Sequence, residues 1–178
     1  MDQRLNRQAW LDAGLATLGA QGQEGLTIMG IARQLGVTKG SFYWHFADMP
    51  SFKAALLEEW ERCDTDGLID FAGWREVDAH ERLRELLSAT VAGKSPLGRA
   101  IRSWSQHDVM AREVQQRVDQ KRLAYVGGLL QQLGWGADDA AALARWVYYA
   151  VIGYFNMDGP PIDDREMALY LGTLIPPK

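Results

Sequence analysis

The apolar positions of this chain recur at helical spacing along nearly its whole length. One segment shows the pattern i, i+3, i+4, i+7 in full, with Ile28, Ile31, Ala32 and Leu35. This spacing places apolar side chains on one face of an α-helix. The alternation of apolar and polar residues that is typical of strands does not extend over any useful length. The pattern therefore predicts an all-α fold.

Turn signals divide this pattern into about nine helices. Glycine and proline punctuate the chain at several points, and residues 64–80 are less regular and read as a connection. The expected helices cover residues 2–20, 27–35, 38–46, 49 to about 63, 79–92, 97–107, 108–133, 138–157 and 163–174.

Capping residues place the ends of the helices between residues 27 and 50. The Thr27 hydroxyl can accept a hydrogen bond from a free backbone N–H at a helix start, and Thr38 and Asp48 are placed to do the same. Gly36 stands where a left-handed cap ends a helix most easily. Pro50 falls in a first helical turn, where proline is tolerated. Two short helices joined by a tight turn at residues 36–37 therefore form a predicted helix-turn-helix.

The second helix of this pair has an outer face suited to the DNA major groove. Phe42 and Phe46 lie one turn apart and are expected to face the core, so that Gly40, Tyr43 and Trp44 point outward. An α-helix fits the major groove, and a glycine allows close approach. The alternative is that Tyr43 and Trp44 pack against the first helix.

This segment resembles the TetR family of repressors. The resemblance rests on Leu26-Thr27-Ile28, Ile31-Ala32 and the run from Gly36 to Phe46, which matches G-V-x-K-G-x-x-Y-x-H-F. It covers about residues 5–60, and the rest of the chain matches only in the number and length of its helices. The resemblance implies that Thr27, Tyr43 and His45 contact phosphates, that Thr38, Lys39, Gly40 and Trp44 lie against base edges or adjacent phosphates, and that Ser41 does either.

The chain departs from the family at the start of the fourth helix. The family usually has a lysine there, and this chain has Met49. A methionine side chain cannot donate to a phosphate, although the backbone N–H at that position can. Lys53, one turn later, is a candidate substitute.

The resemblance also implies two domains: a DNA-binding domain over residues 1–48 and a ligand-binding and dimerisation domain over 49–178. The helices at 138–157 and 163–174 would pair two copies of the chain, since the first of them is apolar nearly all round. The alternative is burial within one copy. Aromatic residues that could line a small-molecule pocket, or could be ordinary core residues, are Trp60, Phe71, Trp104, Tyr125 and Tyr149.

The amino-acid composition excludes few classes of function. The net charge is −4, but residues 1–53 carry five basic and four acidic side chains, and the remainder carries fourteen and nineteen. This asymmetry agrees with a nucleic-acid face near the N-terminus and also with a random distribution of surface charge. One cysteine and three scattered histidines predict no disulfide and no metal site. No signal peptide or membrane span is expected, and so we expect a cytoplasmic, nucleoid-associated protein without a cofactor.

The resemblance to the TetR family implies a homodimeric, sequence-specific repressor that a small hydrophobic ligand releases from a palindromic DNA operator. One alternative is a dimeric DNA-binding protein without an inducer. An enzyme is a third reading, because Asp138-Asp139 and Asp163-Asp164 are paired acids. Adjacent residues on a helix point apart, however, so neither pair forms a carboxylate dyad, and Asp138 is better explained as a helix cap.

Overall fold

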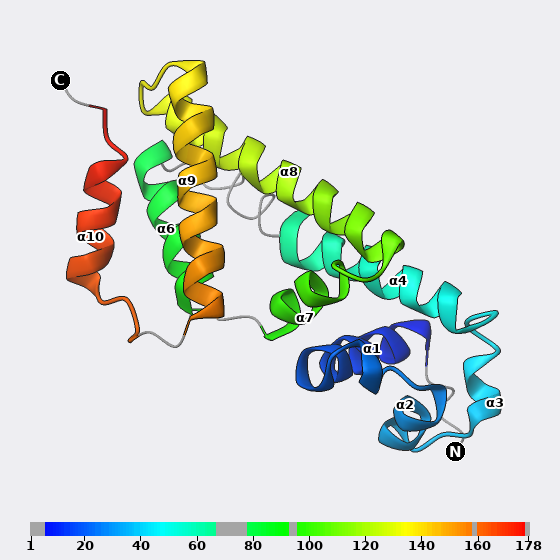
Figure 1. Cartoon of the computed structure of the whole chain (residues 1–178). Coiled ribbons are helices and arrows are strands. Elements are labelled where there is room, and N and C mark those ends of the chain that lie inside the picture. Colours follow the sequence, from blue (N-terminus) through cyan, green and yellow to red (C-terminus); the bar gives the residue numbers. More distant parts are fainter. Residues whose placement is uncertain (1–5, 67–77, 93–95, 158–159, 177–178) are drawn as a thin grey trace. The chain divides into compact units, whose positions relative to one another are not determined.

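The computed structural model describes residues 6–66, 78–92, 96–157 and 160–176, and these are built from helices (Figure 1). No strand occurs in these ranges, which confirms the predicted all-α class. The α-helices are α1 (Arg7–Gln21), α2 (Ile28–Leu35), α3 (Lys39–Phe42), α4 (Met49–Glu61), α6 (Ala79–Ala92), α7 (Pro96–Trp104), α8 (Val109–Gln132), α9 (Ala137–Asn156) and α10 (Asp164–Thr173). A 3₁₀ turn, η1 (Gln23–Gly25), follows α1, and a π-helical turn, η2 (Arg62–Asp66), follows α4.

The chain forms two compact units. The first comprises Met1–Asp64 and Ser95–Arg117, and the second comprises Thr65–Lys94 and Val118–Lys178, so that α8 contributes to both. The division into functional domains at residues 48 and 49 is not tested by this packing and stays a prediction. No helix within the described ranges is both long and apolar enough to cross a membrane.

Local capping determines where α2 begins and ends, as predicted. The Thr27 hydroxyl accepts a hydrogen bond from the backbone N–H of Gly30 at 3.1 Å. Gly36 ends the helix with φ 68° and ψ 27°, a left-handed conformation that costs glycine little. Asp48 caps α4 in the same way as Thr27 caps α2, through the backbone N–H of Ser51 at 2.8 Å.

Three predicted details are wrong. Helix α1 begins at Arg7, because the Asn6 side chain caps it by accepting from the N–H of Ala9. Helix α3 ends at Phe42 instead of residue 46, and Thr38 precedes it without a side-chain capping bond. At the start of α9 the cap position is Gly136, and Asp138 lies within the first turn.

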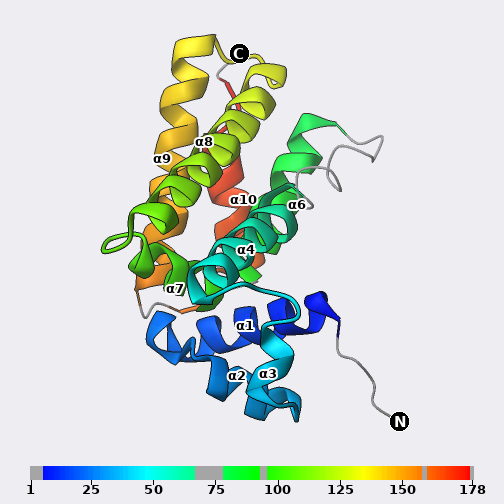
Figure 2. The same cartoon turned by 90° about the vertical axis from the view of Figure 1, so that its right-hand side faces the viewer.

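The core of the first unit is an aromatic cluster beneath α3. The Phe42 ring lies 5.4 Å from Trp10, 5.3 Å from Phe46 and 5.5 Å from Phe52, measured between ring centroids. Gly14 allows α1 to approach α4, because a Cβ there would lie 2.7 Å from the Phe52 ring. Figure 2 shows α1, α2 and α3 as a compact group.

The second unit is a bundle formed by α6, α9, α10 and the second half of α8. Its buried core draws on all four helices, with Leu83 from α6, Leu130 from α8, Ala144 from α9 and Leu171 from α10. The indole N–H of Trp135 donates to the carbonyl of residue 174 at 2.8 Å, which ties the α8–α9 turn to the end of α10. A capping box at the start of α10 fixes where that helix begins.

Candidate nucleic-acid interface

The segment from residue 38 to residue 46 presents two large aromatic side chains to solvent. Trp44 is 87% exposed and Tyr43 is 52% exposed, whereas Phe42 and Phe46 are buried. The predicted orientation of this segment is therefore confirmed, and the alternative, in which Tyr43 and Trp44 pack against α1, is wrong. Whether these side chains contact DNA stays a prediction.

The backbone of this segment tightens after α3. The N–H groups of Tyr43, Trp44 and His45 donate to carbonyls three residues earlier, at 3.0–3.4 Å. Bonds of this kind form a 3₁₀-like turn. The N–H of Phe46 nevertheless donates to the Phe42 carbonyl, four residues earlier, at 3.0 Å, and both rings are buried while Tyr43 and Trp44 are exposed.

The other predicted DNA-contacting residues, apart from Thr27, lie close to Tyr43 and Trp44 in the sequence. Thr38, Lys39 and Gly40 are exposed, Ser41 and His45 are half-buried, and the exposed Thr27 caps the neighbouring α2. The Lys39 ammonium lies 6.0 Å from the centroid of the Tyr43 ring. All eight predicted residues thus belong to the two helices of the helix-turn-helix or to the residues that flank them.

Nothing in the surroundings of Gly40 requires a glycine at this position. Its φ is not positive, and an added Cβ would meet only the Thr38 hydroxyl oxygen, at 3.7 Å. That is an ordinary van der Waals contact, so an alanine would fit and would favour the helix by about 1 kcal/mol. The absence of a side chain at this exposed position lets a partner molecule approach the backbone closely.

The start of α4 carries no basic side chain that is free to face outward. Met49 is half-buried and Pro50 follows it. The Lys53 ammonium lies 5.5 Å from the centroid of the Trp104 ring, on α7. This cation–π contact engages Lys53 with the core of the first unit, which makes it a poor substitute for a lysine at residue 49.

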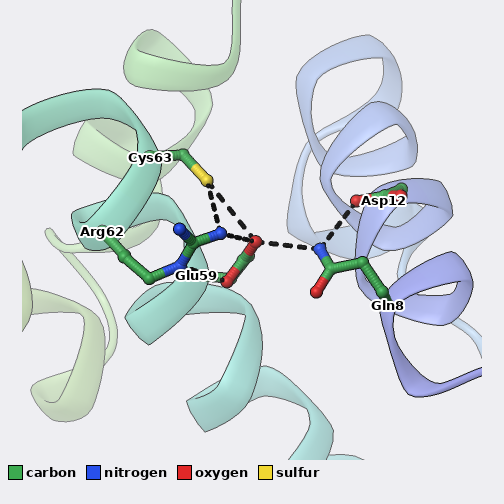
Figure 3. A network of polar contacts seen from close by, with 5 residues as sticks. All are labelled: Gln8, Asp12, Glu59, Arg62 and Cys63. Carbon is green, nitrogen blue, oxygen red and sulfur yellow. Dashed lines mark hydrogen bonds and ion pairs between the residues drawn. The ribbon is translucent and has the colours of Figure 1, made fainter. Parts of the chain in front are cut away.

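A polar network joins the first turn of α1 to the end of α4 (Figure 3). The Gln8 amide donates to Glu59 at 2.8 Å and to Asp12 at 2.9 Å. The Arg62 guanidinium donates to both oxygens of Glu59, at 2.6 and 3.0 Å. These bonds lower the pKa of Glu59 to about 2, with Arg62 as the main cause. Desolvation of the Cys63 sulfur, together with the Glu59 carboxylate, raises the pKa of its thiol.

This network predicts a loss of stability in acid. The Glu59 carboxylate is favoured in the folded chain, so its contribution is complete above its ordinary pKa of 4.5 and is lost as the pH falls towards 2. We expect Glu59→Gln to flatten the dependence of unfolding free energy on pH across this window, as measured by urea titrations. Arg62→Gln should flatten it similarly. Curves for both variants that run parallel to the wild type would contradict the assignment.

The predicted pocket residues that the structure describes lie in different surroundings. Trp60 and Trp104 are buried in the first unit, Tyr125 is half-buried and Tyr149 is exposed in the second unit, and Phe71 lies outside the described residues. Their place in a pocket stays a prediction. A hollow of about 580 Å³ in the second unit has other lining residues: Ser88, Val91, Tyr154, Pro161, Ile162, Asp163, Asp164 and Met167.

Neither paired-acid motif forms a catalytic arrangement in the structure. The Asp163 carboxylate accepts from the backbone N–H of Glu166 at 2.8 Å, as the cap of α10. Asp138 and Asp139 are exposed in the first turn of α9, where negative charge is favoured by the helix dipole. Within the described ranges, no three His, Cys, Asp or Glu residues gather to hold a metal ion.

Comparison with known proteins gives matches of two kinds. Residues 11–59 match the family of bacterial regulatory proteins described as the tetR family. The class D tetracycline repressor of Escherichia coli is 38% identical over 56 residues, which are 32% of this chain and 26% of the repressor. A transcriptional regulator of Pseudomonas putida, TtgW, is 50% identical over 40 residues, 22% of this chain and 30% of the relative. The chain thus matches between a quarter and a third of the length of these curated relatives.

The whole fold also has close structural relatives. A TetR transcriptional regulator from Legionella pneumophila superposes with a TM-score of 0.78 over 98% of this chain and 97% of that one, at 15% identity. The reduced form of NemR from E. coli superposes with a TM-score of 0.75 over 94% and 95%, at 17% identity. These likenesses concern the fold, and the likeness to the family model is confined to residues 11–59. Over this segment, just over a quarter of its length, the chain is similar to the tetR family of bacterial regulatory proteins.

Proposed function

We propose that this chain is a sequence-specific DNA-binding transcriptional regulator, acting in the cytoplasm on the nucleoid as a homodimeric repressor. The observation that carries the proposal is the exposure of Trp44 and Tyr43 on a helix-turn-helix of the tetR family. An indole that is 87% exposed contributes almost nothing to the stability of its own fold. Its presence is explained by a partner that covers it.

DNA is the partner that suits this surface. The aromatic pair is accompanied by Lys39, by the hydroxyls of Thr27 and Thr38, and by the open space at Gly40. Hydroxyls, an ammonium and a tyrosine donate to phosphates, which sets the register on the duplex, and side chains that reach base edges set the sequence preference. The proposed DNA-contacting residues are Thr27, Thr38, Lys39, Gly40, Ser41, Tyr43, Trp44 and His45.

Helices α9 and α10 are the proposed dimer interface. One face of α9 is buried in the second unit through Ala140, Ala144 and Val147. The opposite face leaves Trp146 and Tyr149 more than half exposed, and α10 similarly exposes Leu169. Large apolar side chains gathered on exposed helix faces are typical of protein–protein interfaces. In such a homodimer, residues 1–48 would bind DNA, and residues 49–178 would pair the two copies and bind a ligand.

A palindromic operator follows from a two-fold dimer. Its two helix-turn-helix modules would reach successive major grooves, about 34–36 Å apart. A small hydrophobic ligand would release the repressor if it binds better to a form with a different spacing. The alternative is a dimeric DNA-binding protein without an inducer. The four predicted pocket aromatics that the structure describes, Trp60, Trp104, Tyr125 and Tyr149, lie in different surroundings, which favours this alternative. A panel of hydrophobic and cationic compounds tested by thermal shift separates the two, since only a ligand-controlled regulator gains stability from one of them.

Selection from a library of random duplexes tests the proposed function. We expect enrichment of a palindrome whose half-sites are centred about 10 base pairs apart. Footprinting on the DNA upstream of the protein's own gene would locate the site in its natural context. A library that shows no enrichment, together with no measurable affinity for duplex DNA, would refute the proposal.

Lys39→Ala is expected to weaken binding and to reduce its dependence on salt. A lysine that neutralises one phosphate contributes about 0.9 to the slope of log K against log salt concentration. Fluorescence anisotropy on the selected duplex between 50 and 300 mM salt measures that slope. Lys121→Ala, an exposed lysine of α8 outside the helix-turn-helix, serves as the control and should leave it unchanged. An identical slope for the wild type and Lys39→Ala would remove Lys39 from the interface.

A further inference from the structure

Arg7 places a positive charge beside the helix-turn-helix from a distant part of the sequence. It is the first residue of α1, it is exposed, and its guanidinium carbon lies 5.2 Å from the centroid of the Phe46 ring. Among the described residues, no carboxylate forms an ion pair with it. Arg7 is thus an uncompensated cation that is held against the buried aromatic cluster.

The backbone of Arg7 is fixed on both sides. The Asn6 side chain caps the helix through the N–H of Ala9 at 2.9 Å. Gln8 joins the same turn to Glu59 near the end of α4, at 2.8 Å (Figure 3). A guanidinium that stacks on a ring from a fixed backbone loses little conformational entropy when it binds an anion.

Arg7 also lies close to a predicted phosphate contact. The Phe46 ring is 6.4 Å from the His45 ring, so the guanidinium and the imidazole lie within about 12 Å of each other. Consecutive phosphates of one strand fall within such a span, because each strand carries a phosphate about every 3.4 Å along the duplex axis. Asp48, which follows His45 by three residues, is engaged as the cap of α4 through Ser51.

The start of α4, three residues after Phe46 in the chain, lacks a cation that is free to contact a phosphate. Met49 and Pro50 open α4 without a charge, and the Lys53 ammonium lies over Trp104. A phosphate that approached the junction of His45 and α4 would therefore find Arg7 as the basic side chain beside it. Arginine suits this role because its fork of N–H donors matches phosphate oxygens while its plane stacks on a ring.

We propose that Arg7, stacked on Phe46, is a further phosphate-contacting residue of the DNA interface and supplies the charge that the start of α4 lacks. This proposal rests on the proposed DNA-binding function. Arg7 would contact the phosphates of the duplex and not the base edges, so it would add affinity for every DNA sequence alike.

Salt titrations of three variants test the role of Arg7. The probes are the duplex selected by the wild type and a 40-base-pair duplex of arbitrary sequence. Arg7→Gln keeps a polar side chain and removes its charge. We expect the slope of log K against log salt to fall by about 0.9, and the affinity to fall up to about tenfold at 0.1 M salt, on both duplexes. Arg7→Lys keeps the charge and should retain most of the slope.

Lys53→Gln is the matched control, since it removes one positive charge from the same unit. We expect its slope to equal that of the wild type, because Lys53 is half-buried against Trp104 whereas Arg7 is exposed. Circular dichroism melts establish that each variant is folded at the assay temperature. Arg7→Gln with an unchanged slope, or a loss that appears in Lys53→Gln instead, would overturn the assignment to Arg7 while leaving DNA binding intact. A wild type with no affinity for either duplex would overturn the DNA-binding function itself.

Discussion

Phe42→Ala is expected to lower the free energy of unfolding by about 3–5 kcal/mol, the usual cost of truncating a buried phenylalanine to alanine. The Phe42 ring is fully buried and contacts the rings of Trp10, Phe46 and Phe52. Its removal would leave a cavity in the centre of the first unit and would release the segment that carries Tyr43 and Trp44. Urea denaturation followed by circular dichroism gives the unfolding free energy.

Trp44→Ala is the control for this change, two residues away on the same turn. Because Trp44 is almost fully exposed, we expect its truncation to alter stability by no more than about 0.5 kcal/mol. The same variant should nevertheless bind the selected duplex more weakly, if the indole faces DNA. Equal destabilisation by the two variants would show that Trp44 is packed, and would remove the observation on which the DNA-binding function rests.

Trp146→Glu is expected to convert a dimer into a monomer and to weaken binding to a palindromic duplex at least a hundredfold. The side chain is 55% exposed on the outer face of α9, where a second copy would bury it next to apolar neighbours. A carboxylate buried there without a partner would cost several kcal/mol. A monomer loses the gain from two linked contacts, which amounts to about 10²–10⁴ in affinity. Light scattering coupled to gel filtration distinguishes the 19.9 kDa monomer from a dimer of twice that mass.

Val109→Glu controls for the general effect of a new acid on an exposed apolar position. Val109 is 65% exposed at the start of α8 and does not belong to the proposed interface helices. We expect this variant to stay dimeric and to keep most of its affinity. A Trp146→Glu chain that also stays dimeric would place the interface elsewhere on the molecule.

Features that depend on neighbours in the sequence were predicted well. The start and end of α2 are determined by the Thr27 hydroxyl and by the left-handed Gly36, and both act within four residues of the helix ends. The inward direction of Phe42 and Phe46 follows from helical spacing alone. The family motif was recognisable for the same reason, since it occupies one continuous run of the chain.

Features that depend on packing were predicted poorly or not at all. The spacing of apolar residues predicted α3 to continue to residue 46, whereas the helix ends at Phe42 and is followed by a turn whose N–H groups donate to carbonyls three residues earlier. In the sequence, α9 is apolar nearly all round. In the structure Val147 is buried in the second unit and Trp146 faces outward, because a helix that is apolar all round gives no signal of which face meets which partner.

The sequence by itself determined the helical class, the capped start and end of α2, the capped start of α4, and the outward direction of Tyr43 and Trp44. These depend on propensities and hydrogen bonds that span only a few residues. Only the tertiary structure decided that Arg7 stacks on Phe46, that Gln8 bonds to Glu59, and that Lys53 turns towards Trp104. Each of these pairs is separated by 39 to 51 positions along the chain, and no local pattern encodes such a distance. They arise because the burial of apolar side chains brings α1, α4 and α7 together, and the long polar side chains on those helices then bond to whatever the packing places beside them.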